Sequence, residues 1–561
     1  MNPSLIHGLK DHLILDLGEH KSQVEERLKS WKKQNFSRRL WSKDPTLWFP
    51  EPKPEITDRL GWLVLPETMH EKLEDLVSFA KQVKDEGMSH VVLLGMGGSS
   101  LAPYVFQKTF GNASGYPELI VLDSTHPSAV LAVEDQLDLR RTLFLVSSKS
   151  GTTLETLSLF RFFWKKVSLA TEKPGHHFVA ITDPGSPLMQ LAQERGFRRV
   201  FEANPDVGGR YSAFTYFGLV PAALIGLDIH RLLDRACAAS ENCAFCVSEE
   251  KASGIILGAV MGELARSRDK LTFFASPSIH IFPEWLEQLI AESTGKDGKG
   301  ILPVVAEPYV SPEDYSQDRF FVFLSLEGDD GREHEDRMSE LEKAGHPVVR
   351  LNLKNKFDIG REIFSWEIAV ASAASALGIH PFNQPDVQLA KDFTRTAMEK
   401  GNKEEHGKSD GETLSIDEPE VLDEAFKKWI IQAQPADYVA LQAYLSPKPE
   451  TTIALQDLRL ELLKHTRLAT TLGYGPRLLH STGQLHKGGR NNGLFLQLVD
   501  ELKIDLPIPE TDYDFGTLIK AQALGDYQAL KQRGRRVLRI NLKTDTREGL
   551  KRLQDLIQNQ S

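Results

Sequence analysis

The chain has 561 residues, 41% of them hydrophobic and 26% charged, a composition typical of a globular protein with about two to four domains. Its formal net charge of -11 and the lack of a long basic run argue against nucleic-acid binding, and no apolar run could span a membrane or form a signal peptide. The three cysteines, Cys237, Cys243 and Cys246, fit a reducing compartment, so we expect a cytoplasmic protein.

Residues 1–85 are polar and largely helical in pattern, and we expect them to wrap around the rest of the chain. From residue 86 to 248, short apolar runs alternate with gaps of helix length. This pattern is typical of a parallel sheet with helices on both faces. The strands predicted in this first domain are 90–95, 118–123, 142–146, 177–183 and 198–203.

The same alternation returns in a second predicted domain, residues 249–398. Its expected strands are 271–275, 301–305, 320–326 and 347–353. Residues 399–420 lose aromatic side chains and gain charge, Gly and Ser, which indicates an exposed linker, and residues 421–561 form a further mixed region. We therefore predict an α/β fold with two doubly wound parallel-sheet domains and a C-terminal α/β region.

Two pairs of segments suggest that the C-terminal region partly repeats the second domain. LEKAGHPVVRLNLK (341–354) resembles LKQRGRRVLRINLK (530–543). AESTGKDGKGILPVV (291–305) resembles LHSTGQLHKGGRNNGLFLQLV (479–499), so that Glu292 would correspond to His480. Chance similarity between short segments is the alternative, and the sequence alone leaves both interpretations open.

Two predicted turns between a strand and a helix carry little side-chain bulk. GMGGSS places Gly98 where the backbone can approach a ligand, and SKSGTT places Ser148, Ser150 and Thr153 at the start of a helix. The free N–H groups and positive dipole end of a helix N-terminus bind phosphate. The two turns together predict a pocket for a phosphorylated small molecule, although ordinary capping explains the glycine turn equally well.

A helix is predicted over residues 281–296, and it carries a carboxylate on its apolar face. Trp285, Leu289 and Glu292 share that face by their spacing. Burial and the negative end of the helix dipole would raise the pKa of Glu292 towards that of a general base. A solvated glutamate at a frayed helix end is the alternative.

Other segments contain residues suited to binding anions or moving protons. Arg210 follows two glycines in DVGGRYS, a loop that can present its guanidinium to an anion. Lys391 lies about two turns along a helix that we expect to begin near Gln384. His480 and His486, in LLHSTGQLHKGG, can transfer protons near neutral pH. A purely structural role remains the alternative for each residue.

Taken in order, these motifs resemble the sugar isomerase domains of the glucose-6-phosphate isomerase family. GMGGSS, SKSGTTLET, VGGRYS, ESTGK and the spacing of Gln384 and Lys391 occur in the family order over roughly residues 85–395. Gly151 stands where the family commonly has Phe. The likeness is nearest to the isomerase half of bacterial transaldolase–isomerase fusions and extends through HSTGQLHKGG, but no transaldolase barrel of about 250 residues fits in this chain.

The resemblance implies a glycolytic and gluconeogenic enzyme that interconverts glucose 6-phosphate and fructose 6-phosphate through an enediolate, with no cofactor or metal. Glu292 would move the proton between C1 and C2, Arg210 would stabilise the enediolate, and Lys391 with a histidine would open the ring. The wording TGQLH favours His486 over His480 for this histidine. The implied substrate-binding residues are Gly98, Ser99, Ser148, Lys149, Ser150, Thr153 and Gln384.

Other functions account for parts of the sequence. A dinucleotide-dependent oxidoreductase would explain GMGGSS and Asp123 at the end of the next strand, but it leaves the hydroxyl-rich turn unexplained. A sugar-phosphate sensor, or an isomerase for another sugar phosphate, would share the same domains. In each case we expect a sugar phosphate as partner, no nucleic acid or membrane, and a monomer or homodimer.

The position of the two histidines leads to a further hypothesis. In the common family a dimer partner supplies the ring-opening histidine, whereas here the segment HSTGQLHKGG lies in the apparent repeat, 421–561. A tethered repeat could fold back and take the place of a partner subunit. The alternative is that this region only packs against the core and that the protein dimerises.

Overall fold

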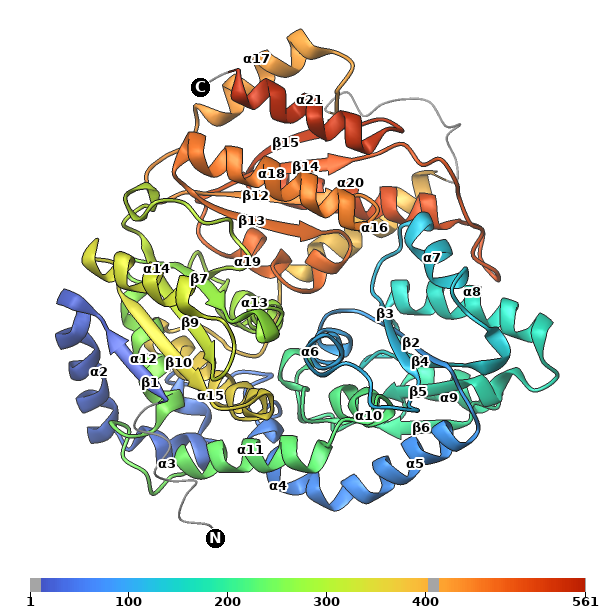
Figure 1. Ribbon diagram of the computed structural model, residues 1–561, viewed down its shortest axis with the longest axis horizontal. Helices are drawn as coiled ribbons and strands as arrows, with labels where there is room; N and C mark the ends of the chain where they lie inside the picture. Colours follow the sequence, from blue (N-terminus) through green and yellow to red (C-terminus); the bar gives the residue numbers. More distant parts are fainter. Residues whose placement is uncertain (1–11, 402–412, 560–561) are drawn as a thin grey trace.

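The computed structural model describes residues 12–401 and 413–559, which form three five-stranded sheets covered by helices (Figure 1). The predicted α/β fold with doubly wound parallel sheets is confirmed. Residues 402–412 of the expected linker lie outside the described residues. No helix in the described ranges is long and apolar enough to cross a membrane.

The first sheet has the strand order β3-β2-β4-β5-β6, with all neighbouring strands parallel. Its central strands are buried on both faces, which is why they read as continuous apolar runs. The strands are β2 (His90–Gly95), β3 (Glu118–Leu122), β4 (Thr142–Ser147), β5 (Phe178–Thr182) and β6 (Arg199–Glu202). Its helices are α6 (Leu101–Phe110), α7 (Pro127–Glu134), α8 (Leu154–Ala170), α9 (Pro187–Glu194) and α10 (Tyr216–Leu224).

The second sheet has the order β1-β10-β9-β7-β8. Its strands are β1 (Leu13–Asp16), β7 (Lys270–Ala275), β8 (Leu302–Val304), β9 (Arg319–Leu326) and β10 (Val348–Leu353). Its helices are α11 (Ile229–Asn242), α12 (Ser253–Leu264), α13 (Phe282–Thr294), α14 (Arg332–Lys343) and α15 (Ile359–Leu377). The N-terminal segment is not wholly helical, because β1 pairs antiparallel with β10 at the sheet edge.

Four helices make up much of the rest of the N-terminal segment. Its helices are α2 (Lys21–Lys33), α3 (Phe36–Trp41), α4 (Leu65–Thr68) and α5 (Leu73–Asp85). Figure 1 shows them in blue along the outside of the first two sheets. Trp31, Trp62 and Phe79 from this segment lie in the apolar core that joins these sheets, so the segment is an integral part of the fold.

The third sheet has the order β11-β15-β14-β12-β13, with all neighbouring strands parallel. Its strands are β11 (Leu414–Ser415), β12 (Tyr438–Tyr444), β13 (Ala469–Tyr474), β14 (Gly493–Val499) and β15 (Arg536–Asn541). The helices of this region are α16 (Val387–Gly401), α17 (Pro419–Ile430), α18 (Pro449–Thr466), α19 (Gly483–Gly488), α20 (Phe515–Gln532) and α21 (Thr546–Gln558).

The second and third sheets share one topology. Apart from the edge strands β1 and β11, each sheet has four strands in the same arrangement: counted in chain order, the first lies between the second and third, and the fourth follows the third. The matched segments 341–354 and 530–543 occupy the same place, a helix leading into the fourth strand. The other match does not hold: Ser293 lies at the end of α13, before the second strand, whereas Ser481 follows β13, the second strand itself. Glu292 and His480 are therefore not topological equivalents.

The third sheet has its own apolar core and also contributes to those of the other two. Phe515 and Leu518 belong to the cluster that contains Phe162 of the first sheet's helices. Ala440 and Leu485 pack in another cluster with Leu302 and Val304 of the second sheet. Residues 413–559 are thus joined to both other parts by buried apolar contacts.

Arg459 on α18 links the third sheet to the second through buried hydrogen bonds. Its Nη1 donates to the carbonyl oxygens of Val305 and Ala306, both at 2.9 Å, and its Nε donates to Thr470 Oγ1 at 2.9 Å. We expect Arg459→Met to leave these acceptors unpaired and to lower the free energy of unfolding by about 2–4 kcal/mol. Urea unfolding followed by circular dichroism measures this loss.

The matched control is Arg552→Met, because Arg552 makes only exposed ion pairs, with Glu548 and Asp417. Its stability should remain close to that of the wild-type protein. Equal stabilities of the two variants would contradict the structural role of Arg459.

Candidate active site

The glycine turn after β2 lies directly against the loop that carries Arg210. A Cβ atom built on Gly98 would lie 2.0 Å from the carbonyl oxygen of Gly209. Only glycine therefore allows this close approach of the two backbones. Ser99 follows in the same turn and is partly exposed. The structure thus brings the two predicted loops together.

Arg210 is buried and points at the end of helix α13. Its Nη1 lies 3.2 Å from Glu292 Oε1 and donates to Gln384 Oε1 at 3.1 Å. Its Nε donates to Ser293 Oγ at 2.7 Å, and its Nη2 donates to the carbonyl oxygens of Pro381 and Asn383. Three predicted site residues, Arg210, Glu292 and Gln384, are therefore in direct contact. The carboxylate of Glu292 keeps 12% of its side-chain surface exposed, so a ligand can reach it.

The hydroxyl-rich loop between β4 and α8 has the features of an anion site. Ser148 and Thr153 hydrogen bond through their hydroxyl groups at 2.8 Å, and Ser150 and Thr152 do so at 2.9 Å. No side chain caps the first N–H groups of α8, so they remain available to a ligand. Gly151 has φ = 68°, which glycine adopts without strain.

Lys149 takes a different direction from its neighbours in this loop. Its Nζ contacts the carboxylate of Asp183 and donates to the carbonyl oxygen of Pro205. The lysine therefore tethers the loop to the segments after β5 and β6. Its charge is already paired, so a contact with the ligand would require this pair to open.

His480 lies in the short helical turn Arg477–His480 and reaches the first sheet. Its Nε2 is 3.0 Å from Glu155 Oε1 on the first turn of α8. Its carbonyl oxygen accepts a hydrogen bond from Gln288 Nε2 at 2.8 Å, and the same Nε2 donates to Glu292 Oε2 at 3.0 Å. A Cβ on Gly97, which has φ = 53°, would lie 2.8 Å from that carbonyl oxygen. The glycine turn, Glu292 and His480 therefore form one site.

His486 lies elsewhere, inside the third region. It is 3% exposed and its Nδ1 hydrogen bonds to the hydroxyl of Tyr438 at 3.0 Å. Burial, together with the charges of Lys487 and Arg535, holds the pKa of His486 well below its usual value. The structure thus separates the two candidate histidines, and only His480 is with the other predicted residues.

Lys391 is exposed on α16, which begins at Val387 rather than near Gln384. Its charge still acts on Glu155. Burial alone would raise the pKa of Glu155, but the charge and hydrogen bond of His480 and the charge of Lys391 lower it overall. Glu155 is therefore an ionised carboxylate between a histidine and a lysine.

The sequence analysis missed three residues of the candidate site: Glu155, Gln288 and Arg477. Glu155 lies inside the quoted motif SKSGTTLET, where a carboxylate after the capping hydroxyls was the available signal. Gln288 is one turn before Glu292 and carries no signal of its own. Arg477 contacts Asp123 at 3.2 Å and Glu284 at 2.9 Å, and so joins all three sheets beside the site.

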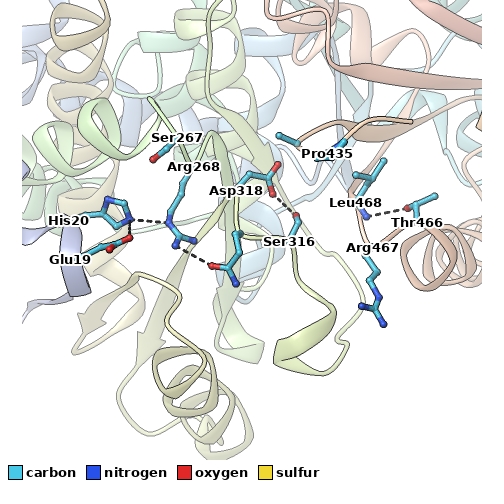
Figure 2. Close-up of a pocket in the computed structure, with 12 residues that line it drawn as sticks. Glu19, His20, Ser267, Arg268, Ser316, Asp318, Pro435, Thr466, Arg467 and Leu468 are labelled. Carbon is cyan, nitrogen blue, oxygen red and sulfur yellow. Dashed lines mark hydrogen bonds and ion pairs between the residues drawn. The ribbon is translucent and has the colours of Figure 1, made fainter. Parts of the chain in front are cut away.

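A cavity of about 540 Å³ opens away from this site (Figure 2). Arg268, Asp318 and Leu468, which line it, lie just before the first residues of β7, β9 and β13. None of the residues that line this cavity is a predicted site residue. Within residues 12–401 and 413–559, no three His, Cys, Asp or Glu side chains are grouped to hold a metal ion.

The sequence matches the family model described as phosphoglucose isomerase over residues 66–301. It is 31% identical over 385 residues to the glucose-6-phosphate isomerase of Staphylococcus saprophyticus, a match that covers 60% of this chain and 86% of that protein. It is 27% identical to the glucose-6-phosphate isomerase of Rubrobacter xylanophilus, with 61% and 90% of the two chains covered.

Two solved structures share the fold. A hypothetical protein of Thermus thermophilus superposes with a TM-score of 0.58 at 25% identity, covering 68% of this chain and 99% of that one. A glucose-6-phosphate isomerase from Chlamydia trachomatis superposes with a TM-score of 0.52 at 18% identity, covering 72% and 87%.

Glu287, on the same helix as Glu292, makes stability depend on pH. Burial, reinforced by the charge of Glu284, raises the pKa of Glu287 from 4.5 to about 8. The folded protein therefore keeps a proton that the unfolded chain releases, and stability falls as pH rises from 4.5 to about 8. We expect Glu287→Gln to remove this loss. The free energy of unfolding of the variant should therefore increase relative to that of wild type across this pH range, and the difference should be constant above it.

Urea midpoints measured at several pH values between about 5 and 9 check this expectation. The exposed position Glu313→Gln is the matched control, and its difference from wild type should stay constant. If the difference in urea midpoint between Glu287→Gln and wild type is also independent of pH, the raised pKa of Glu287 is contradicted.

Proposed function

The chain belongs to the glucose-6-phosphate isomerase family, and on this premise we propose that it interconverts glucose 6-phosphate and fructose 6-phosphate. The observation that carries the proposal is the contact of Arg210 with Glu292 beside a hydroxyl-rich helix N-terminus and a histidine–carboxylate pair. This arrangement supplies a base, a cation for an oxyanion and an anion site. These are the groups that aldose–ketose isomerisation requires.

We assign the proton transfer between carbons to Glu292. Its carboxylate takes the proton from C2 of the open-chain aldose, and the electron pair forms the C1–C2 double bond of the enediolate. The same carboxyl group then returns the proton to C1, while the O2 hydroxyl proton moves to O1. Arg210 is positioned to stabilise the negative oxygen, because its guanidinium is buried and directed at Glu292.

Phosphate binding is assigned to the loop of residues 148–153. Ser148, Ser150 and Thr153 can donate from their hydroxyl groups, and the first N–H groups of α8 add the positive end of a helix dipole. Gly98 and Ser99 would border the sugar, and Gln384 would position it while holding Arg210. Lys149 acts indirectly in this proposal, by fixing the loop to Asp183.

Ring opening is assigned to His480 rather than His486, because His480 contacts the other site residues. Glu155 is ionised and can only accept a hydrogen bond, so the proton shared with it lies on His480 Nε2. In the neutral ring this leaves the Nδ1 lone pair to take the proton of the C1 hydroxyl as the C1–O5 bond breaks, and the imidazolium formed returns a proton to O5. Lys391, whose charge reaches Glu155, is the second candidate group for this step.

We further propose that the C-terminal region completes the site within its own chain. The shared strand order supports a repeat of the second domain, and the buried apolar contacts to both other sheets support its docking in place. In this arrangement the region takes the place that a partner subunit has in the common family. A homodimer would then be unnecessary for activity.

The role of Glu292 can be tested by Glu292→Gln. This variant should lose C1–C2 proton exchange, with a fall in kcat of about 10²–10⁴-fold, because the amide cannot act as a base. Binding of a linear aldonic acid phosphate should stay nearly unchanged, since the 148–153 loop is intact. Exchange in deuterated water followed by NMR, with calorimetry for binding, measures both.

Glu313→Gln serves as the control, because it makes the same change of carboxylate to amide at an exposed residue outside the site. It should retain exchange. Wild-type exchange in Glu292→Gln would show that another group is the base.

The intrachain site can be tested by mixing two inactive variants, Glu292→Gln and His480→Asn. Because each site would use residues of one chain, we expect no activity to return on mixing. Sedimentation at the assay concentration should show that the active wild-type protein is a monomer. Activity regained on mixing would mean that chains share sites, and would refute this arrangement.

A further inference from the structure

Gln522 on α20 joins the third region to the candidate acid–base pair. Its side chain is buried, with 2% of the residue exposed. Its Nε2 donates to Glu155 Oε1 at 2.8 Å, and its Oε1 accepts from Thr125 Oγ1 at 2.8 Å. Glu155 lies on α8 and Thr125 in the loop after β3, so one amide from residues 413–559 bridges two groups of the first domain.

The chemistry of the two partners fixes the orientation of this amide. A carboxylate only accepts, so the NH₂ group of Gln522 must face Glu155. The amide oxygen is then left for Thr125, whose hydroxyl donates to it. Glu155 Oε1 therefore receives two hydrogen bonds, one from Gln522 and one from His480 Nε2.

The same helix also holds the segment that carries His480. Asp526, one turn after Gln522, is fully buried and pairs with Lys487 at 2.5 Å. Lys487 Nζ in turn donates to the carbonyl oxygen of Gly483, three residues after His480. Helix α20 thus fixes both members of the pair, the carboxylate through Gln522 and the histidine segment through Asp526.

We propose that Gln522 is a positioning residue for ring opening, which holds Glu155 Oε1 in line with His480 Nε2. This inference rests on the proposed isomerase function. Without the amide, Glu155 Oε1 loses one of its two side-chain hydrogen bonds and the carboxylate can rotate in its pocket. Misplacement by about 1 Å of a group that orients a catalytic base can cost up to about 10²-fold in rate.

The test compares Gln522→Met with Gln497→Met in the full-length protein. Gln497 is an equally buried glutamine of the third sheet that donates to Ala523 on α20 but does not contact Glu155. We expect Gln522→Met to lower kcat on cyclic glucose 6-phosphate by about 10–100-fold. Its affinity for a linear aldonic acid phosphate should be unchanged, because that ligand needs no ring opening.

The pH profile gives a second readout that a purely structural role would not change. A hydrogen bond to a carboxylate favours its ionised form, so losing the bond makes Glu155 easier to protonate. The acid limb of kcat should therefore move to higher pH in Gln522→Met and stay in place in Gln497→Met. Thr125→Val removes the hydroxyl that donates to the amide oxygen of Gln522, and it should shift the acid limb of kcat in the same direction by a smaller amount. This variant replaces Gln522→Met in the test if Gln522→Met does not fold.

The outcomes separate this inference from the function on which it rests. An active wild type with unchanged kcat and acid limb in Gln522→Met overturns the role of Gln522 alone. Weaker binding of the linear ligand in that variant also overturns it, because the effect would then be a general distortion. A wild-type protein that does not isomerise the sugar phosphate overturns the proposed function itself.

Discussion

The arrangement of the three sheets depends on the partly buried ion pairs of Arg477. Its guanidinium lies 3.2 Å from Asp123 of the first sheet and 2.9 Å from Glu284 of the second, over the ring of Tyr104. A cation that has lost much of its water is costly unless it is paired, so Arg477 favours the arrangement that brings both carboxylates to it. Because His480 is only three residues further on, the same ion pairs that join the sheets also fix the histidine at the site.

The site also depends on two glycines, whose lack of a side chain lets other backbone segments pack directly against them. Gly98 allows the Arg210 loop to approach, and Gly97 allows the carbonyl oxygen of His480 to do so. Gln288 then joins that carbonyl oxygen to Glu292. Segments from all three sheets therefore converge on one glycine turn, which explains why residues far apart in sequence act as one unit.

Local sequence patterns were sufficient to predict most of the strands of the first two sheets and many residues of the candidate site. The ends of the buried strands lie within one residue of the predicted ranges, because parallel strands covered on both faces read as continuous apolar runs. Strand β1 was missed, since it is short and gains its place only by pairing with β10. The choice between His480 and His486 and the part played by Gln522 depend on tertiary packing. No spacing along the chain encodes that packing.

The bridge from Gln522 to Glu155 has a consequence for biosynthesis. Ribosomes add about 5–20 residues per second, so the hydroxyl loop around Ser148 emerges on the order of tens of seconds before Gln522. The first two sheets can close around their own core during that interval, yet the histidine and the amide that complete the site are still missing. The proposed phosphate loop is therefore synthesised well before the proposed acid–base pair, which can form only after residues 413–559 have been made.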